Sequence, residues 1–313
     1  MANKPLVSLV VPLYNEERHA YDNLRAILSL AETSWVDFEL IAVDDGSRDM
    51  TVKEVERASA QDSRISVIAF TRNFGKEAAI HAGLEQARGE VAIVLDSDLQ
   101  HPPALIPQML ELWRGGAFVV EAVKSHRGVE TFSGKLFAKT FYFLFRHLAG
   151  LDLAGHSDFK LLDRKVIETY LAFPERHRFF RGLIGWAKFP SAQVPFSVPE
   201  RAGGGSQWNK LKLIRYAINN LTHFSSLPLR LVTYIGLGTL CIGAAVGIVS
   251  LAQKFRGAAI DGFTTVNLLV ILMGGAILLG LGIVGHYLAL IYDEIKGRPS
   301  YLIKPWKKDS SNE

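Results

Sequence analysis

Hydrophobic and polar stretches alternate regularly over the first third of the chain. Short continuous apolar runs, typical of strands buried on both faces of a parallel sheet, occupy Val7–Pro12, Phe38–Val43, Ile65–Phe70 and Val91–Leu95. Segments with helical spacing of apolar positions lie between them, at Ala20–Glu32, Thr51–Ala60 and Lys76–Ala87. This order predicts an α/β fold with a mostly parallel, Rossmann-like sheet that is covered by helices on both faces.

The pattern becomes less regular beyond Pro103. Ala104–Arg114 has the spacing of a helix, and Phe118–Val123 has the composition of a strand. Thr131–Leu148 is a strongly apolar and aromatic helical segment. Two interpretations of this segment stay open, because it can pack as core or turn part of its surface toward lipid.

Two long apolar segments follow near the C-terminus. Leu231–Ala252 has 22 residues and Val266–Tyr292 has 27, and neither contains a charged side chain. A bilayer core needs about 20 apolar helical residues. The alternative, a pair of buried helices in a soluble protein, is disfavoured because neither segment has a polar face to show water. We therefore predict a hairpin of two transmembrane helices and exclude a fully soluble protein.

The segment before the first apolar run is basic and amphipathic. Trp208–Phe224 places apolar residues on one side of a helix, flanked by Lys210, Lys212 and Arg215. Such a helix is expected to lie along lipid headgroups, although packing on a protein core is the alternative. The expected parts are a cytoplasmic domain over residues 1–205, an amphipathic juxtamembrane segment over 206–228, two transmembrane helices within 229–295 (about 231–252 and 266–292), and a basic tail over 296–313.

The placement of charge predicts the orientation of these parts. The net charge is only +4, but lysine and arginine concentrate before the first apolar segment and after the second, while Gln253–Thr265 between them has two basic residues. By the positive-inside rule, the N-terminal domain and both termini face the cytoplasm in a multi-pass inner-membrane protein. The single cysteine, Cys241, permits no intramolecular disulfide. Pro12 and the acidic residues after it argue against a signal peptide.

Polar clusters follow three of the predicted strands. They are Tyr14-Asn15-Glu16-Glu17, Asp44-Asp45 and Asp96-Ser97-Asp98. In parallel sheets, ligands bind beyond the carboxyl ends of the strands, so we expect an active site here. Asp96 and Asp98 can point the same way, and carboxylate oxygens suit Mg²⁺ or Mn²⁺. Neither a GxGxxG nor a GxxxxGK[ST] motif is present, which disfavours a dinucleotide-binding fold and a P-loop NTPase.

These clusters belong to a longer series of motifs. The series runs Pro12-Leu13-Tyr14-Asn15-Glu16-Glu17, Val43-Asp44-Asp45-Gly46-Ser47-Arg48-Asp49, Asn73-Phe74-Gly75-Lys76, Asp96-Ser97-Asp98-Leu99-Gln100-His101-Pro102-Pro103, Ser157–Arg164 and Tyr292–Pro299. It resembles family 2 glycosyltransferases, and most of all the polyprenyl-phosphate branch that includes dolichol-phosphate mannose synthases and bacterial prenyl-phosphate glucosyltransferases. The resemblance covers nearly the whole chain.

The resemblance implies a GT-A catalytic domain, a nucleotide-sugar donor, a Mg²⁺ or Mn²⁺ ion and a lipid-phosphate acceptor. It implies these site residues: Asp96, Asp98 and Asp158 in catalysis; Pro12, Tyr14, Glu16, Val43, Asp45, Ser97 and Gln100 at the donor; Asp96, Asp98 and Gln100 at the metal; Lys124, Arg127, Arg201 and Ser206 at the phosphates and acceptor. Two positions depart from the pattern, because Lys124 stands where arginine is usual and Gln207 replaces a lysine. Lysine lacks the bidentate fork of arginine, and glutamine removes a positive charge.

The function implied is the inverting transfer of a hexose, first of all glucose from UDP-glucose, to undecaprenyl phosphate for cell-envelope glycan modification. GDP-mannose, UDP-GlcNAc and aminoarabinose donors stay open, as does a non-catalytic membrane scaffold that binds nucleotide sugars. A processive polysaccharide synthase is disfavoured by the missing QxxRW motif. Asp158 either orients the acceptor or assists the metal, or else pairs with an arginine. A homo-oligomer such as a tetramer is expected, and nucleic acid is not.

Overall fold

The computed structural model describes residues 4–31, 33, 35–126, 156–176, 178–197, 227–256 and 262–305. The chain divides into two compact units, one comprising Met1–Gln207 with Arg298–Glu313 and the other comprising Trp208–Gly297. Several predictions lie outside the described residues: the helices at Thr131–Leu148 and Trp208–Phe224, and the site residues Arg127, Arg201, Ser206 and Gln207.

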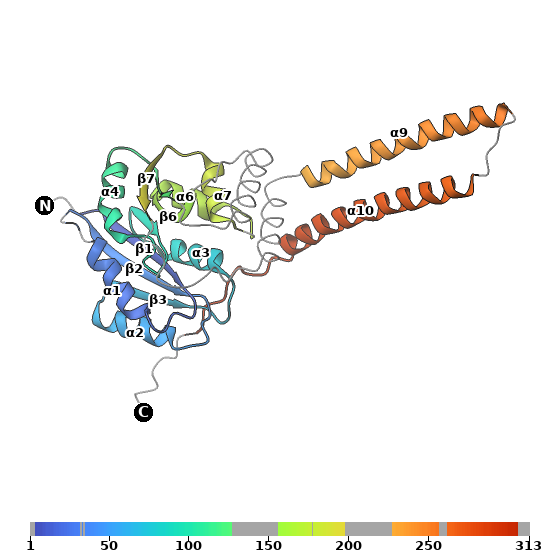
Figure 1. Ribbon diagram of the computed structural model, residues 1–313. Coiled ribbons are helices and arrows are strands. Elements are labelled where there is room, and N and C mark those ends of the chain that lie inside the picture. Colours follow the sequence, from blue (N-terminus) through green and yellow to red (C-terminus); the bar gives the residue numbers. More distant parts are fainter. Residues whose placement is uncertain are drawn as a thin grey trace. The chain divides into compact units, whose positions relative to one another are not determined.

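The first unit is built on a seven-stranded sheet of order β3-β2-β1-β4-β6-β5-β7 (Figure 1). The strands are β1 Leu6–Leu13, β2 Asp37–Asp44, β3 Ile65–Ala69, β4 Val91–Val94, β5 Val119–His126, β6 His156–Asp163 and β7 Ser191–Ser197. β1 to β4 pair in parallel, as the apolar runs predict. β6 runs antiparallel to both of its neighbours, β4 and β5. The predicted α/β fold with a mostly parallel sheet is thus confirmed.

Helices cover both faces of this sheet, as expected. They are α1 Ala20–Ala31, α2 Thr51–Gln61, α3 Lys76–Gln86, the short 3₁₀ helix η1 Pro103–Leu105, α4 Ile106–Arg114, α6 Arg164–Ala172 and α7 Phe180–Ala187. On one face, alternate residues of β1 such as Leu9 join a core cluster with Leu24 of α1 and Met109 of α4. On the other face, α3 approaches β1 so closely that a Cβ on Gly83 would lie 2.3 Å from the Val10 side chain. This close packing requires glycine.

A buried ion pair holds the antiparallel part of the sheet. Lys160 of β6 faces Glu121 of β5 in the strand register, and the two side chains form a salt bridge. The Lys160 side chain is fully buried. Removing one partner of such a pair leaves an uncompensated buried charge, which is strongly destabilising. A lysine inside the sheet also explains why β6 has no continuous apolar run in the sequence.

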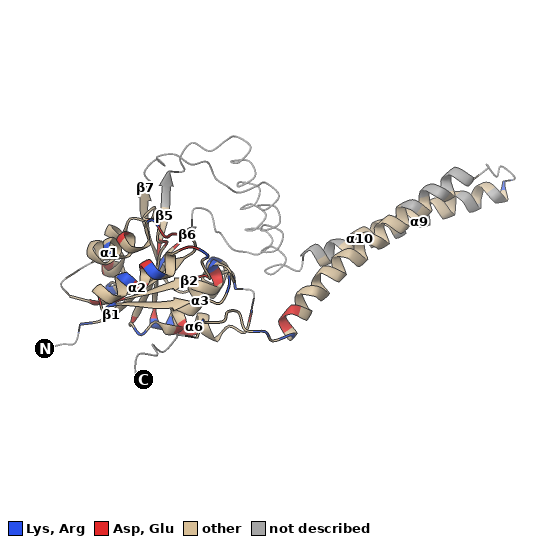
Figure 2. Cartoon of the chain, turned by 90° about the horizontal axis from the view of Figure 1, so that it is seen from below, with Lys and Arg blue, Asp and Glu red and all other residues tan. Residues whose placement is uncertain are grey.

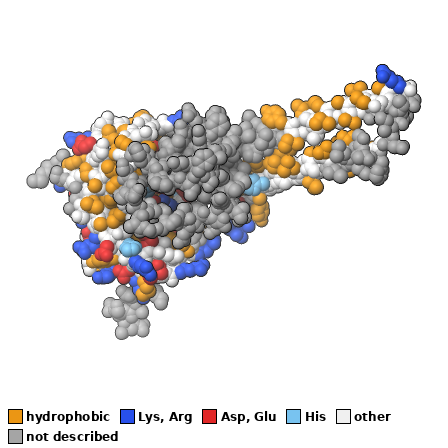
Figure 3. All heavy atoms as spheres, viewed as in Figure 1, with side chains coloured by type: hydrophobic (Ala, Val, Ile, Leu, Met, Phe, Trp, Pro, Cys, Tyr) orange, Lys and Arg blue, Asp and Glu red, His pale blue; other side chains and the backbone are white. Residues whose placement is uncertain are grey.

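In its described residues, the second unit contains two long helices, α9 Leu227–Phe255 and α10 Phe263–Ile295, which contact each other. In the described part of the chain, one segment, Leu272–Ile295, is long and apolar enough to cross a membrane, while the apolar stretch of α9, Tyr234–Val249, is shorter. Large apolar side chains on both helices are exposed, Ile248 and Leu278 each by 71%. Figures 2 and 3 show these helices to be poor in charge along their middles and rich in apolar surface. Exposed apolar area of this extent calls for a non-aqueous surrounding or a partner.

Candidate active site

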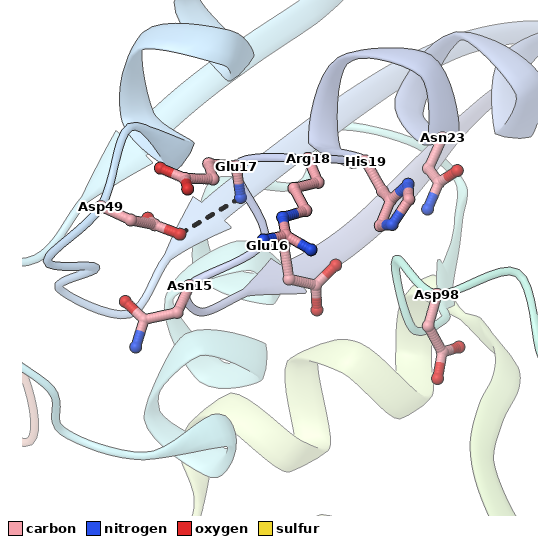
Figure 4. Close-up of a pocket in the computed structure, with 8 residues that line it drawn as sticks. All are labelled: Asn15, Glu16, Glu17, Arg18, His19, Asn23, Asp49 and Asp98. Atoms are coloured by element: carbon pink, nitrogen blue, oxygen red, sulfur yellow. Dashed lines mark hydrogen bonds between the residues drawn. The ribbon is translucent and has the colours of Figure 1, made fainter. Parts of the chain in front are cut away.

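The loops that follow β1, β2 and β4 meet at the carboxyl edge of the sheet and form a polar pocket. Its volume is about 470 Å³, and it is lined by Asn15, Glu16, Glu17, Arg18, His19, Asn23, Asp49 and Asp98 (Figure 4). This is in the size range of small-molecule sites, about 300–1,000 Å³. Because every lining residue is polar or charged, the pocket suits a polar ligand.

The loop after β1 is fastened to the loop after β2. The Asn15 N–H donates to Ser47 Oγ at 2.9 Å, and the Glu16 N–H donates to Thr51 Oγ1 at 2.7 Å. Asn15 has a left-handed backbone, with φ of 55°, which turns the chain sharply at the strand end. These two hydrogen bonds and the turn at Asn15 restrain the loop.

The residues expected to hold the nucleoside differ in their surroundings. Tyr14 is 41% exposed, so its ring is open to a ligand. Pro12 and Val43 are buried and lie opposite each other in β1 and β2. We infer that Tyr14 can contact a ligand directly, whereas Pro12 and Val43 support the loops above them.

Asp45 is 4% exposed, and its carboxylate holds the loop before α3. It accepts hydrogen bonds from the N–H groups of Phe74, at 2.7 Å, and Gly75, at 2.9 Å, and from Asn73 Nδ2 at 2.8 Å. Burial raises the pKa of the Asp45 carboxyl, while these hydrogen bonds act in the opposite direction. Asp45 thus fixes the position of the Asn73–Gly75 loop within the expected donor site.

Asp96 and Asp98 lie on the turn after β4, close to Glu16. Ser97 between them donates through Oγ to Glu16 Oε2 at 2.5 Å, and Asp98 Oδ1 accepts the Gln100 N–H at 3.0 Å. Burial raises the pKa of Glu16, and the negative charges of Asp98 and Asp96 add to this rise. The structure therefore brings together the predicted residues Glu16, Asp96, Ser97, Asp98 and Gln100.

The carboxylates of Asp96 and Asp98 fit a divalent cation that binds together with a diphosphate. Mg²⁺ usually binds through one or two carboxylates plus substrate phosphates and water, which is what Asp96 and Asp98 can offer. Within the described ranges, no group of three or more histidine, cysteine, aspartate or glutamate side chains is arranged to hold a metal by itself. His101 is 5% exposed, with Nδ1 3.5 Å from Asp96 Oδ2 and its ring beside Phe159.

A network of charges links this turn to Asp158 on β6. Lys76 Nζ lies 2.5 Å from Asp96 Oδ1 and 2.7 Å from Asp158 Oδ2. Arg181 of α7 donates to Asp158 through Nε at 2.5 Å and through Nη2 at 2.8 Å. Lys76, at the first position of α3, therefore bridges the two carboxylates.

These contacts keep Asp158 charged. Burial by itself raises its pKa, but the hydrogen bonds and charges of Arg181 and Lys76 outweigh this and hold the pKa well below its usual value. Burial by itself lowers the pKa of the Lys76 amine, but the charges of Asp96 and Asp158 outweigh this effect and raise the pKa. A carboxylate stabilised in this way is a poor proton acceptor. Asp158 thus pairs with an arginine, which is one of the roles predicted for it. Through Lys76 it is also linked to Asp96, an expected metal ligand.

The sequence did not identify Lys76 and Arg181 as site residues. Lys76 ends the Asn73-Phe74-Gly75-Lys76 motif, which was the available signal. Arg181 belongs to a basic cluster, Arg176–Arg181, that lies outside the motif series. In the structure, Arg181 binds Asp158, and Arg178 donates to the backbone carbonyls of Tyr170 and Phe173. Lys124 of β5 lies opposite Phe196 of β7 in the strand register. Its side chain is not among those that the structure describes.

Glu77, next to Lys76, gives the site a pH-dependent stability. Burial, with a contribution from the charge of Asp158, raises its pKa from 4.5 to about 7, although its Oε2 accepts the Phe180 N–H at 2.8 Å. Between pH 4.5 and about 7 the folded state holds a proton that the unfolded state has lost. This contribution to stability is complete below pH 4.5 and is lost as the pH rises through about 7.

We therefore expect Glu77→Gln to reduce the loss of thermal stability between pH 5 and pH 8. Melting temperatures of the detergent-solubilised wild type and variant at both pH values measure this. Glu175→Gln, the same change at an exposed carboxyl, is the control and should keep the wild-type difference. An unchanged difference in Glu77→Gln would contradict the assignment.

The chain is similar in sequence to known glycosyltransferases. The model of the family described as "Glycosyl transferase family 2" matches residues 8–171. A bactoprenol glucosyl transferase of Shigella phage SfII is 34% identical over 300 residues, which cover 95% of this chain and 97% of that protein. An uncharacterized glycosyltransferase of Bacillus subtilis is 36% identical over 299 residues, which cover 95% of this chain and 93% of that protein.

Among solved structures, glucosyl-3-phosphoglycerate synthase from Mycobacterium tuberculosis, in complex with Mn²⁺, UDP and glucosyl-3-phosphoglycerate, is 21% identical. The match covers 70% of this chain and 77% of that chain, with a TM-score of 0.48. The family model spans more than half of the chain, and relatives above 30% identity align over nearly its whole length. The chain belongs to glycosyl transferase family 2.

Proposed function

We propose that this protein transfers glucose from UDP-glucose to a polyprenyl phosphate, with inversion at the sugar carbon. The observation that carries the proposal is the polar pocket of the first unit, which Asp98 lines, together with the neighbouring Asp96, which Lys76 links to Asp158 and Arg181. The names of relatives that match over nearly the full chain, among them the bactoprenol glucosyl transferase of Shigella phage SfII, support the choice of sugar and acceptor.

The chemistry asks for positive charge where the diphosphate departs. A divalent cation, when bound by Asp96 and Asp98 with the donor diphosphate, would neutralise part of that charge. Lys76 lies directly beside Asp96 and adds a fixed positive charge from the protein. Lys124, Arg127, Arg201 and Ser206 remain our proposed phosphate and acceptor ligands, and Gln100 remains a proposed ligand of metal and donor.

The acceptor does not need strong activation. A phosphate monoester has its second pKa at about 6, so it is largely ionised at neutral pH. A general base is therefore of little use, which agrees with the lowered pKa of Asp158. We assign Asp158 the role of holding Lys76 and Arg181 in place. Arg181, whose side chain is 33% exposed, can then meet the anionic acceptor.

We also propose that α9 and α10 both cross the inner membrane, with the catalytic domain in the cytoplasm. Support comes from the length and apolar composition of Leu272–Ile295, the exposed apolar side chains on both helices, and the distribution of lysine and arginine. An anchored enzyme meets a lipid acceptor within the bilayer surface, which raises the effective concentration of that acceptor.

A donor screen tests the function. Full-length protein in detergent, with Mg²⁺ and undecaprenyl phosphate, is expected to convert labelled UDP-glucose into an organic-soluble labelled lipid, and UDP-GlcNAc and GDP-mannose much more slowly. Omitting the acceptor is the control. A labelled lipid only from GDP-mannose would favour the mannosyltransferase alternative. Binding of nucleotide sugars without turnover would favour a scaffold, and a water-soluble polymer would favour a polysaccharide synthase.

A further inference from the structure

The segment after α10 packs on the edge of the seven-stranded sheet. Residues from Arg298 onward belong to the first unit. Ile303 forms an antiparallel bridge with Phe70, the Thr71 N–H donates to the Leu302 carbonyl at 2.9 Å, and the Lys304 N–H donates to the Ala69 carbonyl at 2.7 Å. Since β3 is the outermost strand on this side, the segment satisfies backbone groups that would otherwise be unpaired at the edge.

Tyr301 anchors this segment through its ring. The ring stacks on that of Phe70, with centroids 4.9 Å apart and planes 14° from parallel. Its hydroxyl donates to Glu85 Oε2 on α3. Phe70 is fully buried and meets Phe74 edge to face, with centroids 5.8 Å apart. A continuous row of aromatic contacts therefore runs from Tyr301 through Phe70 to Phe74.

Phe74 belongs to the loop that Asp45 holds from the other side. The Phe74 and Gly75 N–H groups both donate to the Asp45 carboxylate. Gly46, with φ of +68°, lies so close to this loop that a Cβ there would be 2.2 Å from the Arg72 carbonyl carbon. The loop over Thr71–Gly75 thus lies between the expected nucleoside site and the tail.

We propose that Arg298–Lys304, anchored by Tyr301, is a positioning segment for the Thr71–Gly75 loop, which binds Asp45 of the expected nucleoside site. Tyr301 does not contact the donor; it fixes Phe70 and Phe74, and through them the backbone that Asp45 binds. The proposal rests on the proposed function, because it takes a uridine nucleotide as the ligand. It gives the tail beyond α10 a part in donor affinity.

The test compares full-length Tyr301→Ala, Tyr301→Phe and Leu302→Ala, the last removing an exposed side chain from the same segment. We expect Tyr301→Ala to weaken UDP binding, measured by calorimetry with Mg²⁺, about tenfold, the order of one lost aromatic contact. The KM for the donor should rise likewise, with the KM for undecaprenyl phosphate unchanged. Tyr301→Phe, which keeps the stacked ring, should retain wild-type binding, as should Leu302→Ala.

Hydrogen exchange separates this proposal from the proposed function, because it needs no ligand. In Tyr301→Ala, the amides of Phe74 and Gly75 should exchange faster than in the wild type, whereas those of β1 should not change. A lower melting temperature with unchanged UDP affinity would overturn the proposal. If the wild type does not bind UDP, the proposed function fails, and unchanged exchange at Phe74 and Gly75 would then overturn the positioning role as well.

Discussion

Replacing Asp96 with asparagine is expected to lower turnover about 10³-fold, equivalent to about 4 kcal/mol of transition-state stabilisation. Asparagine keeps the shape of the side chain but removes its charge. The change removes one of the two carboxylates proposed for the cation, and it leaves Lys76, 2.5 Å away, without one of its two partners. The first effect removes stabilisation of the charge that develops on the departing diphosphate, and the second loosens the position of Lys76.

The rate of labelled lipid formation at saturating donor measures this effect, and the Mn²⁺ affinity of the donor-free protein, from the free-ion EPR signal, gives an independent readout. Asp62→Asn is the matched control, because Asp62 makes its ion pair with Arg64 on the surface, away from the site. Exposed pairs of this kind contribute little to stability. Wild-type turnover and Mn²⁺ affinity in Asp96→Asn would contradict the assignment.

The sequence predicts the parallel half of the sheet well because those strands are buried on both faces. Such strands consist almost entirely of apolar residues, and loops of turn-forming residues separate them from the helices. The antiparallel strand β6 escapes this reasoning, since it contains Asp158 and Lys160. Both charges are buried and compensated by residues distant in the sequence, Arg181 and Glu121. Only the folded chain shows that compensation.

The site follows the same division between local and distant information. The strand-end positions of Asp45, Asp96 and Asp98 follow from motif and periodicity, and the structure places all three at one edge of the sheet. The partners of Asp45 and Asp158 do not follow, because they lie on other elements. Arg181 illustrates the limit, since it lies outside the motif series and only the fold places it against Asp158.

The tail after α10 shows most plainly what cannot be predicted from local sequence. The Tyr292–Pro299 motif is recognisable in the sequence, and the residues after it are predicted only as a basic tail. Nothing local indicates that Ile303 pairs with Phe70, far away in the chain. Long-range strand pairing of this kind depends on which edge the folded sheet leaves open.

The network around Lys76 should behave as one unit when it is dissected. We expect Lys76→Met and Asp158→Asn each to lower turnover about 10²-fold, and the double variant to lose about as much as either, because residues that act as a unit are strongly non-additive. Without Lys76, the carboxylates of Asp96 and Asp158 lose the cation between them. Without the charge of Asp158, Lys76 and Arg181 lose the group that holds them.

Turnover of the four proteins at saturating donor and acceptor measures this coupling. The surface pair Arg57–Glu54, at 3.3 Å, provides a matched cycle in which no loss is expected. Independent losses that multiply to about 10⁴-fold in the double variant would show that the two residues act separately. Full turnover in Asp158→Asn would reject a functional role for this carboxylate. Non-additive loss would instead assign Asp158 the positioning of the cations, since its lowered pKa already makes it a poor general base.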